Sequence, residues 1–215
     1  MTDTPHENHH NDCKGMPMNT DTSARLKDAI ETRAKQIIDP ADREFMVLED
    51  RAVIALSAEY DCSHREVYQV ALEHNIWPYR YIRNRDILSR DEQLVLLHSQ
   101  VAVIGSGGLG GTVILLLARI GIGHLSVVDC DSFDETNLNR QAVSTVDNTG
   151  DPKAEEARKM VRGINPAVSV RSFCLKIDSI SAPPILSGSN VIVDALDNVP
   201  DRLALETVAR SLKIP

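Results

Sequence analysis

The stretch Val101-Ala-Val-Ile104, which runs directly into Gly105-Ser-Gly-Gly-Leu-Gly110, decides the fold of this chain. The four apolar residues suit a short buried strand, and an apolar helical pattern follows the glycines to about Ile120. A second apolar run begins at Leu125 and ends on the carboxylate of Asp129. A strand, a glycine turn, a helix and a second strand that ends on an acid predict a nucleotide-binding βαβ unit.

The glycines of this turn have separate physical roles. Gly105 lets the chain turn sharply off the strand, Gly107 removes a side chain where backbone must approach phosphate, and Gly110 lets the helix pack close to the sheet. The helix N-terminus then offers free N–H groups and the positive end of its dipole to an anion. Asp129 lies 19 residues after Gly110, where a carboxylate accepts hydrogen bonds from ribose hydroxyls. The turn predicts a nucleotide without separating ATP from NAD.

Three charged residues after the turn favour ATP. Arg140 follows Asp129 by eleven residues, Lys153 follows Arg140 by thirteen, and Asp197 ends an apolar run that begins at Val191. Nucleotidyl transfer needs cations on the phosphates and a carboxylate on magnesium, whereas hydride transfer needs a nicotinamide pocket and a positioned acid or base. Taken singly, the two cations suit a solvated surface and Asp197 suits a helix cap. Their occurrence together after one glycine turn favours a site for Mg-ATP.

Beyond the glycines, the motifs resemble the ThiF/MoeB/HesA family, bacterial relatives of the ubiquitin-activating enzymes. The resemblance covers roughly Arg80 to the C-terminus, and Arg80–Asn84 resembles the stretch that precedes the glycine strand in the family. The matching residues are Gly105, Gly107, Gly108 and Gly110, Asp129 with Asp131, Asn137-Leu-Asn-Arg140-Gln141, Gly150-Asp-Pro-Lys153, and Asp194-Ala-Leu-Asp197-Asn198.

The resemblance implies an ATP-dependent adenylyltransferase. Members of the family use Mg-ATP to activate the C-terminal carboxylate of a small ubiquitin-like sulfur-carrier protein, and they release pyrophosphate. By the same resemblance the glycine turn, Asp129 and Asp131 bind the nucleotide, with Asp129 on the ribose.

The resemblance also assigns the charged residues. Asn137, Arg140 and Lys153 would hold the phosphates, and the two cations would stabilise the charge that builds during transfer. Asp197 would bind magnesium. Arg83 would reach across a subunit interface to the ATP of the partner subunit, so the resemblance implies a homodimer.

The cysteines give no support to two other features of the family. Cys13, Cys62, Cys130 and Cys174 form no Cys-x-x-Cys pair, so no zinc site is evident. Cys130 lies between two aspartates, whose charges raise the pKa of a thiol and disfavour a thioester nucleophile. In the family, a further strand and the surface that binds the carrier protein follow the point that corresponds to Pro215. We therefore expect a domain that is incomplete at its C-terminus: either a complete nucleotide-binding half with a weakened sheet edge, or a fragment of a longer protein that is unstable alone.

Composition restricts the partners and the compartment. The 215 residues carry a net charge of −8, which argues against nucleic acid or an anionic membrane as the main partner. No apolar run approaches the roughly 20 residues of a membrane span, and the N-terminus has no stretch of the signal-peptide type. Few, unpatterned cysteines fit a reducing compartment. We expect a cytoplasmic protein.

The chain divides into three predicted parts. Residues 1–22 are polar and predict a disordered tail. Residues 23–78 predict a small all-helical module, with helices over about 23–37, around 45–56, and from the capping box Ser63-His-Arg-Glu66 onward. Residues 79–215 predict a Rossmann-like α/β domain, a mostly parallel sheet flanked by helices, with a short loop or turn at 180–189. The helix after the glycines is apolar nearly all round, which predicts burial or a dimer interface.

Two other functions stay open on sequence alone. A nucleotide-binding pseudo-enzyme or scaffold would use the helical module to dock a partner. An NAD- or FAD-dependent oxidoreductase would use the same glycines and Asp129, although the sequence offers no acid–base pair for hydride transfer.

Overall fold

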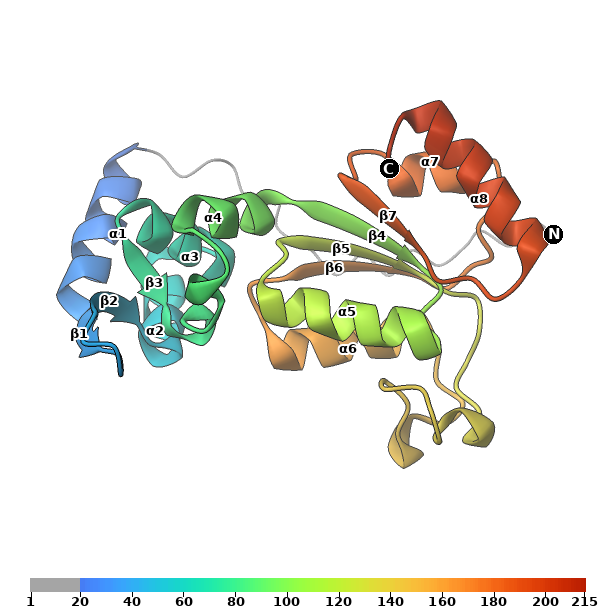
Figure 1. Cartoon of the computed structure of the whole chain (residues 1–215), viewed down its shortest axis with the longest axis horizontal. Helices are drawn as coiled ribbons and strands as arrows, with labels where there is room; N and C mark the ends of the chain where they lie inside the picture. Colours follow the sequence, from blue (N-terminus) through green and yellow to red (C-terminus); the bar gives the residue numbers. More distant parts are fainter. Residues whose placement is uncertain (1–19) are drawn as a thin grey trace.

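A parallel four-stranded sheet between two layers of helices forms the larger part of the computed structural model, which describes residues 20–215 (Figure 1). The strands lie in the order β6-β5-β4-β7, and each neighbouring pair is parallel. They are β4 (Gln100–Ile104), β5 (His124–Val128), β6 (Ser169–Phe173) and β7 (Val191–Asp194). The predicted Rossmann-like α/β fold is confirmed.

Helices α5 and α6 cover one face of this sheet, and α7 and α8 cover the other (Figure 1). They are α5 (Gly108–Ile120), α6 (Lys153–Ile164), α7 (Ala182–Leu186) and α8 (Val199–Leu212). The prediction of a short loop or turn over residues 180–189 is wrong, because this stretch contains α7. Its two prolines lie in the first turn, where a helix does not need their missing N–H groups.

β4 is one of the two inner strands of the sheet and is buried on both faces. Val101 and Val103 pack with α5 and α6, whereas Ala102 and Ile104 pack with the α7–α8 layer, because successive side chains of a strand point to opposite faces. The chain continues from β4 to β5 and β6 on one side and then places β7 on the other. The strand order therefore reverses at β4, and the crevice at the carboxyl ends of β4 and β7 is where open α/β sheets bind ligands.

The N-terminal module contains a three-stranded sheet, so the prediction of an all-helical module is wrong. In this sheet β1 is antiparallel to β2, and β2 is parallel to β3. The elements are α1 (Thr20–Arg33), β1 (Lys35–Ile38), β2 (Glu44–Leu48), α2 (Asp50–Tyr60), α3 (His64–Glu73) and β3 (Ile76–Pro78). Helix α1 includes residues 20–22 of the predicted tail, and the rest of that tail lies outside the described residues.

A β-hairpin turn around Pro40 lies where the sequence predicts the connection between two helices, over about 23–37 and around 45–56. The Asp39 carboxylate accepts hydrogen bonds from the backbone N–H groups of Ala41 and Arg43, each at 2.9 Å, and Asp42 has a left-handed φ of 57°. Local side-chain hydrogen bonds of this kind hold tight turns and compete with helix formation. The apolar residues that follow also fit a helical spacing, but the turn pairs them with β1 as a strand.

Capping boxes begin the next helices, as predicted for Ser63. The Ser63 hydroxyl accepts from the Glu66 N–H at 3.2 Å, and the Glu66 carboxylate accepts from the Ser63 N–H at 2.7 Å. Ser89 and Glu92 form the same motif at the start of α4 (Arg90–His98), the helix that leads into β4. Two short 3-10 turns, Tyr79–Tyr81 and Asn84–Asp86, connect β3 to α4.

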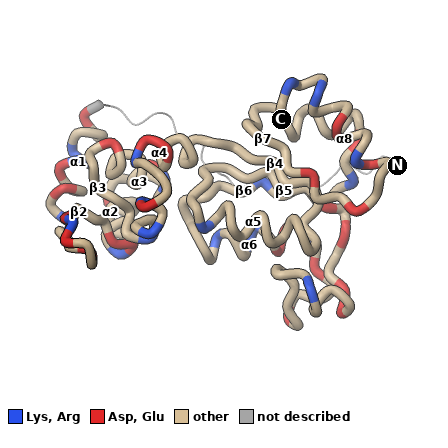
Figure 2. Tube along the Cα trace, in the orientation of Figure 1, with Lys and Arg blue, Asp and Glu red and all other residues tan. Residues whose placement is uncertain are grey.

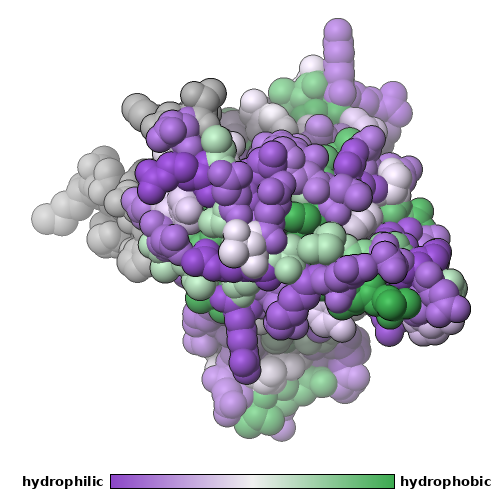
Figure 3. All heavy atoms as spheres, turned by 90° about the vertical axis from the view of Figure 1, so that its left-hand side faces the viewer, coloured by the Kyte–Doolittle hydropathy of each residue, from purple (hydrophilic) through white to green (hydrophobic). Residues whose placement is uncertain are grey.

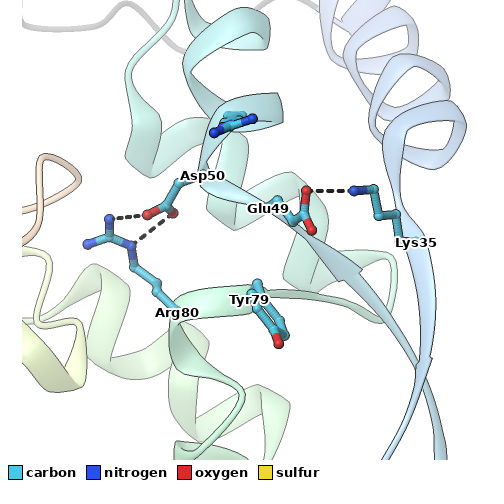
Figure 4. Close-up of a pocket in the computed structure, with 6 residues that line it drawn as sticks. Lys35, Glu49, Asp50, Tyr79 and Arg80 are labelled. Atoms are coloured by element: carbon cyan, nitrogen blue, oxygen red, sulfur yellow. Dashed lines mark hydrogen bonds and ion pairs between the residues drawn. The ribbon is translucent and has the colours of Figure 1, made fainter.

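Polar contacts, one of them fully buried, join the N-terminal module to the parallel sheet and its helices. The Tyr81 side chain is fully buried, and its hydroxyl accepts from Asn165 Nδ2 at 2.7 Å. Arg80 donates to the Ile164 carbonyl oxygen at 2.9 Å and forms an ion pair with Asp50 at 2.6 Å (Figure 4). The guanidinium therefore ties the N-terminal end of α2 to the C-terminal end of α6.

The Asp50→Asn substitution is expected to lower the melting temperature by a few degrees at neutral pH. The Arg80 guanidinium, which hydrogen bonds to the carboxylate, lowers the pKa of Asp50 and outweighs the opposing effect of burial. The Asp50 side chain is 46% exposed, so screening by solvent limits the contribution to about 1 kcal/mol, or roughly 2–4 °C.

The sign of the pH dependence follows from the lowered pKa. The stability due to Asp50 is present above the unfolded pKa of about 3.9 and is lost as the pH falls through the lower folded pKa. Thermal unfolding of the wild type and of Asp50→Asn from neutral pH to about pH 2 measures the difference between their melting temperatures. A difference in melting temperature that stays constant over that pH range would contradict the prediction.

Seen from the side of the N-terminal module, the surface is mostly hydrophilic, and its apolar side chains form small separate groups (Figure 3). Over residues 20–215, no helix combines the length and the apolar character needed to cross a membrane.

Candidate active site

The glycine turn follows β4 and lies against the end of β7. Gly105 has a positive φ of 94°, and its N–H donates to the Val128 carbonyl oxygen of β5 at 2.8 Å. A Cβ added at Gly105 would lie 2.7 Å from the Ala195 carbonyl oxygen, and one at Gly110 would lie 1.8 Å from the Gly105 carbonyl oxygen. Close backbone approach therefore requires both glycines, as expected for a sharp turn and a tightly packed helix.

The N-terminus of α5 is open to an anion. Gly107 is its N-cap residue and supplies no side chain to cap the first N–H groups, and the helix is 13 residues long. Such a terminus presents unpaired donors and a partial positive charge. A Cβ at Gly107 would lie 3.7 Å from Gln141 Nε2, and one at Gly108 would lie 3.9 Å from the Arg140 carbonyl oxygen. The segment that begins at Arg140 therefore lies against the start of α5.

Asp129, directly after β5, is joined to the glycine turn through Ser106. Asp129 Oδ2 accepts from the Ser106 N–H at 2.7 Å and from the Ser106 hydroxyl at 3.0 Å, and Oδ1 accepts from the Asp131 N–H at 2.9 Å. Ser106 is completely buried. Spacing and motif predict no role for Ser106, and the only sign of one in the sequence is a hydroxyl group in a turn otherwise made of glycine and leucine.

Lys153 is the first residue of α6 and lies beside the end of β5. Its side chain is only 9% exposed, Nζ is 3.1 Å from Asp131 Oδ2, and its N–H donates to the Asp131 carbonyl oxygen at 2.9 Å. A cation buried to this extent needs an acid or an anion beside it. The Asp131 side chain is 64% exposed. Asp131 is the one partner of Nζ among the described residues, so the ammonium keeps further N–H groups for a second anion.

The long connection between β5 and α6 carries Asn137 and Arg140. It is closed at its base by an antiparallel bridge between Ser132 and Pro152. Asn137 is buried, and its Oδ1 accepts from the Asp134 N–H at 3.0 Å, which stabilises a 3-10 turn over Glu135–Asn137. The oxygen of this carboxamide therefore holds the loop, and its Nδ2 makes no hydrogen bond to residues 20–215.

The Arg140 guanidinium is exposed and contacts its own loop. It donates to the Thr136 carbonyl oxygen at 2.8 Å and to Asn139 Oδ1 at 3.1 Å. The structure thus brings the Arg140 backbone to the glycine turn but leaves the charged end on the loop. A change of side-chain rotamer is needed for Arg140 to reach a phosphate at the start of α5.

Asp197 follows β7, on the other side of β4 from Asp129. It is exposed and makes no hydrogen bond or ion pair to any residue that the structure describes. Asn198 caps α8 by accepting from the Asp201 N–H at 3.0 Å, so Asp197 is not the helix cap. Figure 2 shows acidic positions where the chain leaves β5 and β7. The Asp197 carboxylate is therefore free to bind a cation at the strand ends.

Arg83 lies at the opposite end of α5 from the glycine turn. The next residue, Asn84, donates to the carbonyl oxygen of Ile120, the last residue of α5, at 3.1 Å. A helix of 13 residues is about 20 Å long, which places Arg83 beyond reach of the glycine turn in its own chain. Arg83 is exposed and has no hydrogen bond or ion pair within the described range.

Cys130 has the chemical environment that the sequence indicates. Burial, and then the charges of Asp131 and Asp129, raise the pKa of the Cys130 thiol. The ligand atoms of these three residues lie within 4.8 Å of one another. A raised pKa disfavours a thiolate nucleophile at this position.

Helix α5 is apolar on its outer face as well as its inner face. Ile114 and Ala118 are completely buried, but Leu109 and Leu116 are 64% and 60% exposed and Ile120 is 37% exposed. The exposed residues recur with a spacing of seven and then four, so they form one stripe along the helix. The first alternative predicted for this helix, burial, therefore holds only for its inner face.

A pocket of about 550 Å³ lies in the N-terminal module, away from the carboxyl ends of the parallel strands β4, β5 and β7 (Figure 4). It is lined by Lys35, Glu49, Asp50, Arg51, Tyr79 and Arg80. Two of its cations are matched by acids, since Lys35 pairs with Glu49 at 2.7 Å and Arg80 pairs with Asp50. This pocket lacks a glycine turn. The expected nucleotide site is therefore at the carboxyl ends of β4, β5 and β7 instead.

Comparison with known proteins points to one family. The sequence model of the ThiF family matches residues 80–215. The SAMP-activating enzyme E1 of Haloferax volcanii is 44% identical over 138 residues, which make up 63% of this chain and 51% of the relative. The sulfur carrier protein adenylyltransferase of Thermus thermophilus is 37% identical over 120 residues, 56% of this chain and 44% of the relative. The chain thus spans about half the length of these relatives.

Solved structures of similar fold contain adenine nucleotides. The tRNA N6-threonylcarbamoyladenosine dehydratase TcdA of E. coli, in complex with ATP, matches 65% of this chain and 58% of its own, with a TM-score of 0.62 and 30% identity. E. coli MccB, in a structure with AMPCPP and MccA, matches 61% of this chain and 42% of its own, with a TM-score of 0.55 and 26% identity.

Proposed function

The chain belongs to the ThiF family, as its motifs predicted, and from that premise we propose that it is an ATP-dependent adenylyltransferase. Its substrate is the C-terminal carboxylate of a small ubiquitin-like sulfur-carrier protein. The names of the relatives from Haloferax volcanii and Thermus thermophilus support this substrate class. The nucleotide-binding domain spans residues 79–215, and a requirement for ATP fits a cytoplasmic location.

One chain of hydrogen bonds carries the proposal. Lys153 pairs with Asp131, the Asp131 N–H donates to Asp129, and Asp129 accepts from Ser106 in the glycine turn. It links a buried cation, a strand-end acid and an open helix N-terminus at one edge of the sheet. Cations fixed beside a phosphate-binding turn stabilise the charge of nucleotidyl transfer, and hydride transfer has no need of them.

Each residue of the candidate site has a separate role in the proposed adenylation. A carboxylate oxygen of the carrier attacks the α-phosphorus of ATP, the bond from that phosphorus to the bridging oxygen breaks, and pyrophosphate leaves with the electron pair. Asp129 accepts from the ribose, and the start of α5 and Asn137 Nδ2 donate to the phosphates. Arg140 and Lys153 neutralise the charge that grows on the phosphate oxygens.

Magnesium fits the Asp197 carboxylate. The side chain is exposed, has no partner among residues 20–215, and follows β7 at the ligand-binding edge of the sheet. Magnesium binds through one or two carboxylates together with phosphate oxygens, and it supplies charge neutralisation on the leaving pyrophosphate. In this proposal Asp197 holds the metal against the phosphates.

The active unit that we propose is a homodimer. Arg83 is about 20 Å from the glycine turn of its own chain, so only the turn of another copy is available to it. The exposed stripe of Leu109, Leu116 and Ile120 on α5 offers apolar surface for such an interface.

Mixing two inactive variants tests the shared site. Arg83→Ala and Arg140→Ala are each expected to lack activity. A 1:1 mixture that exchanges subunits contains about half mixed dimers, and each mixed dimer holds one site with both arginines. Activity is therefore expected to return to about a quarter of the wild-type value. A mixture as inactive as its components would contradict the shared site.

Pyrophosphate exchange tests the reaction itself. Calorimetric titration of ATP, with and without magnesium, is expected to show magnesium-dependent binding. Exchange of labelled pyrophosphate into ATP is then expected only when a ubiquitin-like carrier that ends in glycine is added. Binding without exchange would indicate a nucleotide-binding scaffold, and NAD binding that ignores magnesium would indicate an oxidoreductase.

A further inference from the structure

One buried side chain beside the glycine turn has no hydrogen-bond partner. Gln141 is 8% exposed, and its Oε1 is buried without a partner among residues 20–215. Its Nε2 also makes no hydrogen bond to a described residue, but this atom is not fully buried. Buried carboxamides are normally hydrogen-bonded, because an unpaired polar group in the interior is costly. The isolation of this one needs an explanation.

The backbone of Gln141 is already fixed by its own contacts. Its N–H donates to the Asn137 carbonyl oxygen at 2.9 Å, and its carbonyl oxygen accepts from the N–H and the hydroxyl of Ser144 at 3.0 and 2.7 Å. The side chain therefore adds no hydrogen bond to the stability of the loop.

The carboxamide faces the N-terminus of α5. Its Nε2, Cδ and Oε1 lie 3.7, 3.9 and 3.9 Å from the position of a Cβ on Gly107, which is the N-cap of that helix. No side chain caps the N–H groups there. A side-chain donor and unpaired backbone donors thus converge on one place, an arrangement that suits an anion with several acceptor oxygens.

We propose that Gln141 is a nucleotide-binding residue whose Nε2 donates to the phosphate at the N-terminus of α5. The inference rests on the adenylyltransferase function proposed above. It adds an uncharged donor to the cations Arg140 and Lys153. A neutral donor fixes the position of the phosphate without neutralising its charge. The cations Arg140 and Lys153 therefore still stabilise all of the charge that develops in the reaction.

Two substitutions test this role. Gln141→Met removes both polar atoms at nearly constant length and is expected to weaken ATP binding about tenfold, the usual effect of losing a hydrogen bond to a charged group. Without ATP its melting temperature is expected to equal or exceed that of the wild type, because unpaired polar atoms give way to apolar ones. Gln141→Glu places a second negative charge against the phosphate and is expected to weaken binding further.

Asn165→Leu is the matched control. Asn165 is also a buried carboxamide, but its Nδ2 donates to the Tyr81 hydroxyl and to the Ala118 carbonyl oxygen, at 2.7 and 2.9 Å. It follows the C-terminal end of α6, one helix length from Lys153. This substitution is expected to lower the melting temperature and leave ATP affinity unchanged.

Titration calorimetry of Mg-ATP into the full chain and the three variants, with thermal unfolding in the absence of ATP, decides the question. If the wild type binds ATP and Gln141→Met binds it equally well, the inference is wrong and the proposed function stands. A Gln141→Met protein that is destabilised without ATP as much as Asn165→Leu would show a structural role and overturn the inference. A folded wild type that binds no ATP would overturn both.

Discussion

Arg140→Ala is expected to reduce ATP–pyrophosphate exchange by about a thousandfold or more while the fold stays intact. An arginine on a transferring phosphoryl group accounts for rate effects of roughly this size. The Arg140 guanidinium is exposed, and its two hydrogen bonds go to Thr136 and Asn139 of the same loop. Its removal should therefore change the free energy of unfolding by no more than about 0.5 kcal/mol.

The exchange assay and urea unfolding, run side by side, separate the two effects. Arg162→Ala is the control, because Arg162 is an exposed arginine near the far end of α6 that makes no hydrogen bond or ion pair to residues 20–215. It should exchange at the wild-type rate. Arg140→Lys keeps the charge but loses the planar fork of donors, and it should recover only part of the rate. Normal exchange in Arg140→Ala would remove this residue from the proposed mechanism.

Gly110→Ala is expected to have the largest effect on stability. The added Cβ would lie 1.8 Å from the Gly105 carbonyl oxygen and 3.0 Å from the Ala195 Cβ. Backbone cannot yield as the end of a flexible side chain does, so the helix or the turn must move. We expect a loss of about 3 kcal/mol or more in the free energy of unfolding, together with loss of ATP binding.

Gly163→Ala gives the opposite expectation. A Cβ at Gly163 would meet no atom within 4 Å, and the residue lies within helix α6. Alanine there should raise stability by up to about 1 kcal/mol, because glycine is the poorer helix former. Denaturant unfolding of the two variants measures both values. A Gly110→Ala protein as stable as the wild type would show that the glycine turn does not pack against the start of α5 in this way.

The parts of the fold that the sequence predicts are those set by local signals. The apolar run before Gly105, the glycines and the capping box at Ser63 act over a few residues, and each leads to the expected element. The hairpin at Pro40 was missed because Asp39 holds it by side-chain hydrogen bonds, which periodicity does not report. Helix α7 was missed because prolines in a first turn look like helix breakers.

In the candidate site, too, the sequence predicts what local signals set and misses what depends on the folding of distant segments. Asp129 and Asp197 could be placed from the sequence, since the carboxyl ends of parallel strands share one edge of the sheet. The links from Ser106 to Asp129 and from Gln141 to Gly107 depend on how distant segments fold together, and no spacing rule reports them. The turning of the Arg140 guanidinium toward Thr136 likewise depends on the shape of the folded loop.

The contact between Gly105 and Ala195 sets the order in which the parts of the glycine turn fold as the chain is synthesised. These residues are ninety positions apart in sequence, yet the Ala195 N–H donates to the carbonyl oxygen of Ile104, and the Ala195 backbone closes the glycine turn. During synthesis, β4, α5 and β5 leave the ribosome well before β7, so the edge of β4 that later pairs with β7 is unpaired at that time. The nascent chain must close this loop before its nucleotide turn is complete. In the proposed function, ATP therefore binds only after β7 has paired with β4, and its binding energy stabilises that pairing.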